Sequence, residues 1–227
     1  MRAPALSRRL QVALDLVGHT GTLADVGCDH GKLCVCACVK GIALRAVAVD
    51  ISAPSLAKAE RLAAEYDVAL VLRHADGLTA TAQDGVDTAV IAGMGGMETA
   101  RILALATYCP PRLVLVPHKN VDVVRRYLKL AGYRIDRDLV LQDGGHWYTA
   151  IAATADAGVT TLGDGWQRAV DALPDSGDWY VGADNRDNPD FAAYCRQRIE
   201  KLQRLLSLGN RDPKVAAELR CLQEYAQ

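Results

Sequence analysis

Short runs of β-branched and aliphatic residues alternate with helical patterns over the first 131 residues, and this alternation restricts the fold more than any other feature. Most runs are followed by a segment with apolar residues at helical spacing. Strands that alternate with helices form βαβ units, which build a parallel sheet covered by helices on both faces. The expected strands are Thr22–Val26, Ala46–Val49, Ala69–Arg73, Thr88–Ala92 and Leu113–Val116, and the expected helices are Lys32–Lys40, Pro54–Tyr66, Met97–Thr107 and Val121–Ala131.

Two further patterns complete the expected α/β core. Apolar residues recur at helical spacing from Leu6 to Val17, and the pattern stops at Gly18, which predicts an amphipathic helix. Tyr133–Leu141 and Trp147–Ala153 are strand-like runs whose short connection has no room for a helix, so we expect an antiparallel hairpin. Parallel strands closed by such a hairpin resemble the Rossmann-like methyltransferase sheet, whereas nicotinamide dehydrogenases usually end in another parallel strand.

The last part of the chain predicts a helical extension. Residues 191–206 and 215–226 carry apolar stripes at helical spacing. Between them, Gly209 provides a stop, Asp212 an N-cap and Pro213 a first-turn proline. We therefore expect a ligand-binding domain with an N-terminal helix over residues 1–155, and a linker with a C-terminal α-helical, coiled-coil-like hairpin over residues 156–227.

Composition excludes several classes of protein. Half of the residues are hydrophobic, but no apolar run approaches the ~20 residues that span a bilayer, and the N-terminus lacks a signal peptide's hydrophobic region. We expect a soluble, cytoplasmic protein without a membrane partner. Among the seven cysteines, Cys34, Cys36 and Cys38 alternate and no CxxC pair occurs, so we expect small buried residues on a core helix rather than a metal site.

Basic residues are concentrated in two stretches although the formal net charge is only -1. The segment from Asp138 to Asp190 is, by contrast, strongly acidic. Basic faces bind phosphate backbones, but solvated helix faces give the same pattern equally often. The first stretch contains Arg112, Lys119, Arg125, Arg126, Lys129, Arg134 and Arg137, and the second contains Arg196, Arg198, Lys201, Arg204, Arg211 and Lys214.

The segment Leu23–Gly31, which joins the first strand to a helix, carries the strongest motif. Gly27 and Gly31 let the backbone approach a ligand, and the carboxylates of Asp25 and Asp29 suit a cationic amine. A dinucleotide site has glycine where Asp29 stands, because a carboxylate there repels a diphosphate. S-adenosylmethionine has an amine and a sulfonium but no phosphate, so the motif favours it as the cofactor.

Two more acids end the next strands. Asp50 lies about 20 residues beyond Gly31, where a carboxylate reaches both ribose hydroxyls, and Asp76 stands where it accepts a hydrogen bond from the adenine amine. Open α/β sheets bind ligands at this edge. The fourth strand ends in the small-residue turn 91–96, whereas methylases acting on exocyclic amines tend to have a polar residue and Pro-Pro-aromatic there. That difference favours another acceptor atom.

Five segments together resemble one family. These are Leu6–Leu10, Ala24–His30, Asp76–Leu78, Ile91–Gly96 and Leu115–Pro117. The chain is similar over essentially its whole length to the bacterial tRNA (adenine(22)-N1)-methyltransferases, whose C-terminal helices form a coiled-coil-like domain. This chain departs from the family at two positions. It has His118 where the family tends to have asparagine, and Cys28 where the family has serine.

The resemblance implies methyl transfer from S-adenosylmethionine to N1 of adenine 22 in tRNA. N1 already has a lone pair, so the reaction needs alignment more than a strong base. The hypothesis is that Asp29 and the turn 93–96 face a base extruded from the tRNA stack while cations contact phosphates. The implied residues are Asp29 and Met94 for catalysis; Asp25, Gly27, Cys28, His30, Gly31, Asp50, Ile51, Asp76, Gly77, Leu78 and Gly93 for the cofactor; and Arg9, Gly95, Gly96, His118, Arg125, Arg126 and Lys129 for tRNA.

Three alternatives stay open at this point. The same cofactor core permits methylation of another RNA or of a small molecule. An RNA-binding relative without catalysis is a second alternative, although RNA binding alone needs none of the acids. A nicotinamide enzyme is the third, and Asp29 and the terminal hairpin disfavour it. The sequence fits both a monomer and a homodimer.

Overall fold

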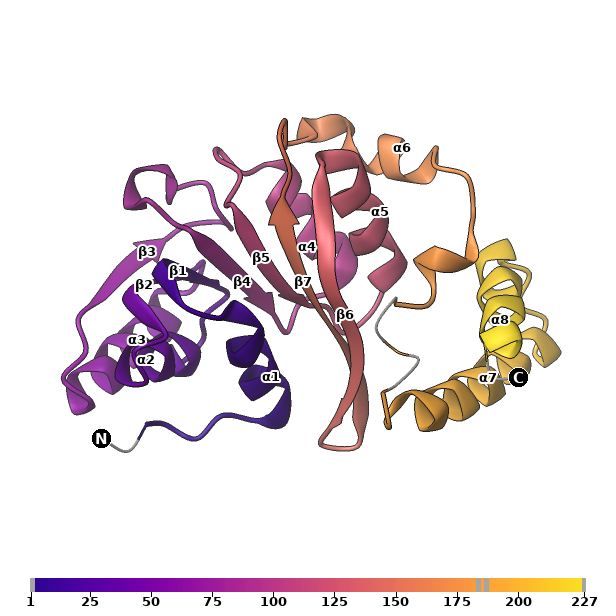
Figure 1. Cartoon of the computed structure of the whole chain (residues 1–227), viewed down its shortest axis with the longest axis horizontal. Helices are drawn as coiled ribbons and strands as arrows, with labels where there is room; N and C mark the ends of the chain where they lie inside the picture. The colour runs from indigo at the N-terminus through magenta and orange to yellow at the C-terminus, as the bar shows by residue number, and fades with distance from the viewer. Residues whose placement is uncertain (1–2, 183–184, 186–187, 226–227) are drawn as a thin grey trace.

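A seven-stranded sheet forms the centre of the protein (Figure 1). The computed structural model describes residues 3–182, 185 and 188–225. The strand order is β3-β2-β1-β4-β5-β7-β6; the first five strands in that order are parallel, and β6 and β7 are antiparallel. The strands are β1 (Thr20–Val26), β2 (Ala43–Asp50), β3 (Leu70–His74), β4 (Thr88–Ala92), β5 (Arg112–Val116), β6 (Tyr133–Asp143) and β7 (His146–Ala155).

Helices cover both faces of this sheet. The apolar residues of α1 and α2 pack with Leu23 of β1, whereas those of α4 and α5 pack with its neighbour Ala24, because successive strand residues point to opposite faces. The central strands β1, β4 and β5 are buried on both faces, which explains their nearly continuous apolar sequences. The helices are α1 (Arg8–Val17), α2 (Lys32–Val39), α3 (Ala53–Glu65), α4 (Gly96–Ala104) and α5 (Val121–Ala131).

The predicted antiparallel β-hairpin, formed by β6 and β7, is confirmed, and its strands are longer than expected. Gly144 and Gly145 form a two-residue turn in which both φ angles are positive, 55° and 80°. Tight hairpin turns favour this conformation, and glycine adopts it without a steric penalty. Strand pairing therefore continues to Asp143 and His146, beyond the expected ends of both strands.

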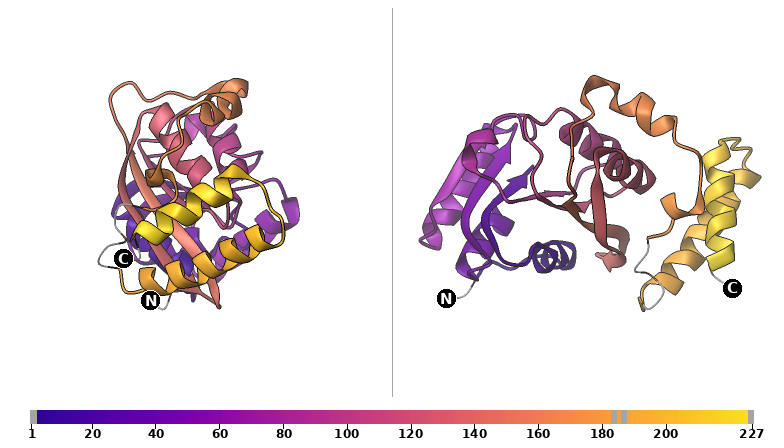
Figure 2. Two further views of the ribbon diagram at one scale, coloured as in Figure 1. Left: turned by 90° about the vertical axis from the view of Figure 1, so that its right-hand side faces the viewer. Right: turned by 45° about the horizontal axis from the view of Figure 1, so that its top comes forward.

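Two antiparallel helices, α7 (Phe191–Ser207) and α8 (Pro213–Tyr225), form the predicted C-terminal hairpin beside the sheet (Figure 2). Gly209 has a φ of 87°, and the side chain of Asp212 accepts a hydrogen bond from the Lys214 amide at 2.9 Å, as expected for a glycine stop and an N-cap. Apolar residues of both helices pack on Val140 of β6. We call this helical pair the C-terminal hairpin.

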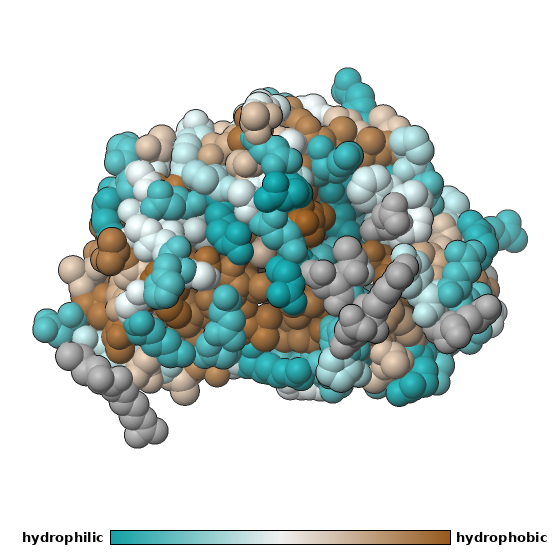
Figure 3. Space-filling view, in the orientation of Figure 1, coloured by the Kyte–Doolittle hydropathy of each residue, from teal (hydrophilic) through white to brown (hydrophobic). Residues whose placement is uncertain are grey.

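The segment before this hairpin contains structure that the sequence patterns did not predict. Among its described residues are a short helix, α6 (Trp166–Asp171), and 3-10 turns at Gly163–Gly165 and Gly177–Trp179. Another 3-10 turn, Ala82–Asp84, precedes β4. Within the described part of the chain, no helix is long and apolar enough to cross a membrane. Hydrophilic residues cover much of the face in Figure 3, and apolar residues are visible around α1.

Candidate active site

Three carboxylates meet at the edge where the parallel strands end. The side chain of Asp50, the last residue of β2, accepts hydrogen bonds from the amides of Asp29 at 3.1 Å and Ser52 at 2.8 Å. Asp25 is near enough to both acids for their charges to raise its pKa. We call Asp25, Asp29 and Asp50 the acid cluster. The sequence placed these residues at one edge, and the structure brings them together.

Burial and neighbouring negative charges disfavour the charged form of one member of the acid cluster, Asp25. Asp25 is 6% exposed, and burial, followed by the charges of Asp50 and Asp29, raises its pKa from 3.8 to about 7. A cationic partner would strongly stabilise the charged form of a carboxylate that is buried and has two like charges beside it. Burial also raises the pKa of the Cys28 thiol well above its usual range, so Cys28 is an inert, protonated neighbour.

Glycines shape the turn between β1 and α2 for two different reasons. Gly27 has a φ of 75°, and the methyl group of Met94 occupies the place where a side chain on Gly27 would begin. Met94 therefore lies over the first turn of the site. Gly31 is buried, and a Cβ there would stand 2.7 Å from the Cβ of Ala59. Gly31 thus allows close packing of α3, which the ligand-based interpretation of this glycine did not include.

Asp76 has a partner that the sequence analysis missed. Both of its oxygens accept hydrogen bonds from Arg101 of α4, at 2.7 and 3.1 Å, and these bonds lower the pKa of Asp76. Arg101 also pairs with Glu98 at 2.7 Å. The spacing of Glu98 and Arg101, three residues apart on one helix, is the sequence signal for an ion pair between them.

The remaining residues expected to bind the cofactor differ in their exposure. Ile51 is 71% exposed beside Asp50, and its carbonyl oxygen contacts the ring of His74 at 2.9 Å. His30 is exposed and lies 3.5 Å from Asp29. Leu78, by contrast, is fully buried in the core, and a Cβ on Gly77 would stand 2.7 Å from Ile102 of α4. Only the backbone of these last two residues is therefore available to a ligand.

The turn after β4 is joined to the loop after β5 by backbone hydrogen bonds. The Gly96 amide donates to Lys119 O at 2.7 Å, and the His118 amide donates to Met94 O at 3.0 Å. A side chain on Gly96 would overlap the Asn120 carbonyl, so only glycine permits this contact. The two loops therefore form one unit, which we call the paired loops (residues 93–96 and 117–120).

Arg9 stands beside the paired loops. Its guanidinium lies 5.2 Å from the centre of the Tyr148 ring, and its Nη1 atom is 3.9 Å from the position that a Cβ on Gly93 would take. His118 is exposed on the same side. The structure thus brings together Arg9, Gly93 and His118, which the sequence assigned separately to substrate and cofactor.

The expectation that Arg125 and Arg126 contact RNA phosphates does not agree with the structure, because each is only 4% exposed and already paired. Arg125 binds both oxygens of Asp138, at 2.7 and 2.9 Å, and the Trp179 carbonyl at 2.8 Å. Arg126 binds Asp175 at 2.6 Å. Both arginines therefore hold the segment before the C-terminal hairpin against α5. Lys129, also expected to contact tRNA, is exposed in the last turn of α5.

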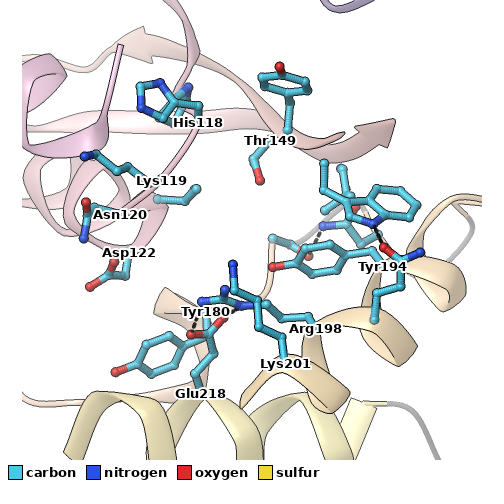
Figure 4. Close-up of a pocket in the computed structure, with 18 of the residues that line it drawn as sticks. His118, Lys119, Asn120, Asp122, Thr149, Tyr180, Tyr194, Arg198, Lys201 and Glu218 are labelled. Carbon is cyan, nitrogen blue, oxygen red and sulfur yellow. Dashed lines mark hydrogen bonds and ion pairs between the residues drawn. The ribbon is translucent and has the colours of Figure 1, made fainter. Parts of the chain in front are cut away.

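A cleft of about 960 Å³ separates the paired loops from the C-terminal hairpin (Figure 4). Its near wall contains Arg9 and residues 117–122, its floor contains Thr149 of β7, and its far wall contains residues of α7 and α8. We call this space the hairpin cleft. Among the described residues, no group of three or more His, Cys, Asp or Glu side chains is placed to hold a metal ion.

Comparison with known proteins agrees with this geometry. The family model described as "Methyltransferase domain" matches residues 6–151. A curated relative, the tRNA (adenine(22)-N(1))-methyltransferase of Bacillus subtilis (strain 168), is 28% identical over 155 residues, which cover 66% of this chain and 65% of the relative. The aligned part is therefore less than two thirds of that relative's length.

Solved structures extend the likeness over nearly the whole chain. The M1A22 tRNA methyltransferase of Bacillus subtilis has a TM-score of 0.80 at 24% identity, covering 98% of this chain and 99% of that one. A Streptococcus pneumoniae protein described as a candidate tRNA (m1A22) methyltransferase, solved with S-adenosyl-L-methionine, has a TM-score of 0.79 at 25% identity, covering 98% and 100%. The predicted resemblance to the tRNA (adenine(22)-N1)-methyltransferases is confirmed. Because the family model matches more than half of the chain and includes every member of the acid cluster, this chain belongs to the methyltransferase domain family.

Proposed function

We propose that this protein transfers a methyl group from S-adenosylmethionine to N1 of the adenine at position 22 of tRNA. The observation that carries the proposal is the acid cluster beside the paired loops, in a chain similar to enzymes named for this reaction. The cluster provides carboxylates for a cationic ligand, and the paired loops provide a neighbouring surface with little side-chain bulk.

The donor chemistry of the site fits S-adenosylmethionine. Asp25 would hold its amine, Asp50 its ribose hydroxyls and Asp76 its adenine amine. Three carboxylates so close together would repel a diphosphate. When bound, the cofactor supplies an electrophilic methyl group on a positively charged sulfur.

The chain's own residues would contribute alignment rather than proton removal. N1 of adenine has a free lone pair, so the protein needs to hold the base in line with the methyl group. Gly93, Gly95 and Gly96 keep the paired loops narrow, which leaves space for a base taken out of the tRNA stack. Asp29, 71% exposed at the same edge, would orient the amine of that base.

Transfer of labelled methyl from S-adenosylmethionine to unmodified tRNA, followed by nucleoside analysis, tests the proposal. We expect 1-methyladenosine with wild-type tRNA and none with tRNA carrying guanine at position 22. Label in another nucleoside would instead assign the chain to a different RNA reaction. Cofactor binding without any labelled tRNA would retain the methyltransferase assignment and contradict the substrate.

The raised pKa of Asp25 predicts how cofactor binding depends on pH. Asp25 is mostly protonated below about pH 7 and charged above it, and a cationic amine prefers the charged form. Affinity for S-adenosylmethionine, measured by calorimetry, is expected to rise by at most about tenfold per pH unit between about pH 5 and 7 and then to level off.

The variant Asp25→Asn serves as the control for this titration. Its affinity should be lower at pH 8 and should lack the rise seen for the wild type. Because the folded pKa is raised, Asp25 destabilises the ligand-free protein as the pH increases from about 4 to 7, so Asp25→Asn should melt at a higher temperature at pH 8. An unchanged pH profile in the variant would assign the titration to another group.

A further inference from the structure

We infer that the hairpin cleft holds the phosphodiester backbone of the RNA substrate next to the target base, and that Lys119 and Lys201 contact phosphates from opposite walls. This inference rests on the proposed function and gives the C-terminal hairpin a defined role in it. The cations concerned differ from Arg125 and Arg126, to which the sequence assigned this contact.

The ion pairs of the cleft identify which cations are available to a ligand. Arg198 is bound by both oxygens of Glu218, at 2.6 and 2.7 Å, and Arg125 is paired with Asp138. Within the described residues, no carboxylate lies within 4.0 Å of the amine of Lys119 or Lys201, and both side chains are exposed. These two lysines therefore contribute positive charge that no carboxylate among the described residues neutralises.

Lys119 lies close to the place proposed for the target base. Its side chain crosses Gly95, since a Cβ there would stand 2.9 Å from the Lys119 Cε atom. The preceding residue, His118, is hydrogen-bonded to Met94 in the paired loops. A phosphate bound by Lys119 would thus belong to the target nucleotide or to one beside it.

Lys201 projects from α7 on the other side of the cleft, as Figure 4 shows. Several contacts fix this wall relative to the sheet. Arg8 of α1 pairs with Asp190 at 2.8 Å, immediately before α7, and the Trp147 indole donates to Gln197 at 2.7 Å. A wall held in place before the substrate arrives reduces the entropy lost on binding.

The lining of the cleft favours RNA over an apolar protein partner. Arg9, Lys119, Lys201 and Lys214 provide cations, while Trp147, Tyr180 and Tyr194 provide aromatic surface. Among the lining residues that the structure describes, only Asp122, Asp212 and Glu218 are acidic, and Glu218 is paired with Arg198. Cations combined with aromatic rings are typical of surfaces that follow a nucleic-acid strand.

The experiment compares tRNA binding by the wild type and by the double variant Lys119→Ala/Lys201→Ala over a series of salt concentrations, using fluorescence anisotropy. Each phosphate contact contributes about one unit to the slope of log affinity against log salt. We expect the double variant to bind roughly tenfold more weakly at ~0.1 M salt, with a slope smaller by about 2. Lys201→Ala alone should show about half of that decrease in slope, or about one unit.

Lys40→Ala provides the matched control. Lys40 is exposed at the end of α2, bonds Gln11 at 3.2 Å and does not line the cleft, so its removal should leave the salt slope unchanged. Melting temperature and cofactor affinity should be unchanged in all variants, because the substituted lysines are exposed.

The outcomes separate this inference from the proposed function. An unchanged affinity and slope in the double variant, with adenine methylation intact, would overturn the inference alone. A change in oligomeric state without any change in RNA binding would mark the cleft as a protein interface and also overturn it. A wild-type protein that neither binds nor methylates tRNA would overturn both.

Discussion

Replacing Arg125 with alanine is expected to lower the free energy of unfolding by about 3–5 kcal/mol. Arg125 and Asp138 are 5% and 3% exposed in their side chains, and two hydrogen bonds join them. Removing the guanidinium leaves a buried carboxylate without this charged partner and releases the carbonyl of Trp179. Urea denaturation followed by circular dichroism measures the loss.

Arg134→Ala is the control for this prediction. Arg134 also pairs with two carboxylates, Asp136 at 3.1 Å and Asp156 at 3.2 Å, but its side chain is 62% exposed. Its removal should cost less than about 1 kcal/mol, because solvent screens exposed ion pairs. Equal losses in the two variants would show that burial does not determine the strength of the Arg125–Asp138 pair.

Replacing Asp29 with alanine is expected to lower kcat/KM for tRNA methylation by at least ~100-fold while the protein stays folded. The side chain is 71% exposed, so its removal leaves no cavity, and its amide remains able to bond Asp50. The loss should therefore come from the misplaced base and not from unfolding. Single-turnover methyl transfer and a thermal melt, measured on the same sample, distinguish the two causes.

Asp29→Asn separates charge from backbone conformation. Asp29 has a φ of 48°, a left-handed conformation that asparagine tolerates better than alanine. If the carboxylate itself orients the base, both variants lose turnover. If the Asp29→Asn variant keeps the wild-type rate, the negative charge of the carboxylate is not required, because the amide oxygen of asparagine also accepts a hydrogen bond from an amine.

The strands and helices of the core were predicted within a few residues because their signals are local. Thr88–Ala92 and Val121–Ala131 have the bounds that their apolar periodicity indicated. The acids also met at one edge, since parallel strands bring their carboxyl ends together. Short elements such as α6, six residues long, contain too few residues to show a period.

Contacts between distant residues account for what the sequence did not indicate. Arg126 and its partner Asp175 are 49 positions apart, so a run of basic residues reads as an exposed face although Arg125 and Arg126 within it are buried and paired. The same applies to Arg101, 25 positions from Asp76. Leu78 belongs to a segment correctly placed near the site, yet its side chain points into the core. Charge patterns along a chain do not reveal which charges the fold neutralises.

The position of β7 between β5 and β6 determines when the sheet can be completed during synthesis. β7 lies between β5 and β6, so β6 leaves the ribosome before its neighbour in the sheet exists. Until residues 146–155 emerge, the nascent chain exposes one edge of β5 and both edges of β6, and unpaired strand edges promote association between chains. The two-glycine turn after β6 is the shortest common hairpin connection, so β7 begins to emerge almost directly after β6. This short delay favours completion of the sheet before neighbouring chains on the same polysome associate.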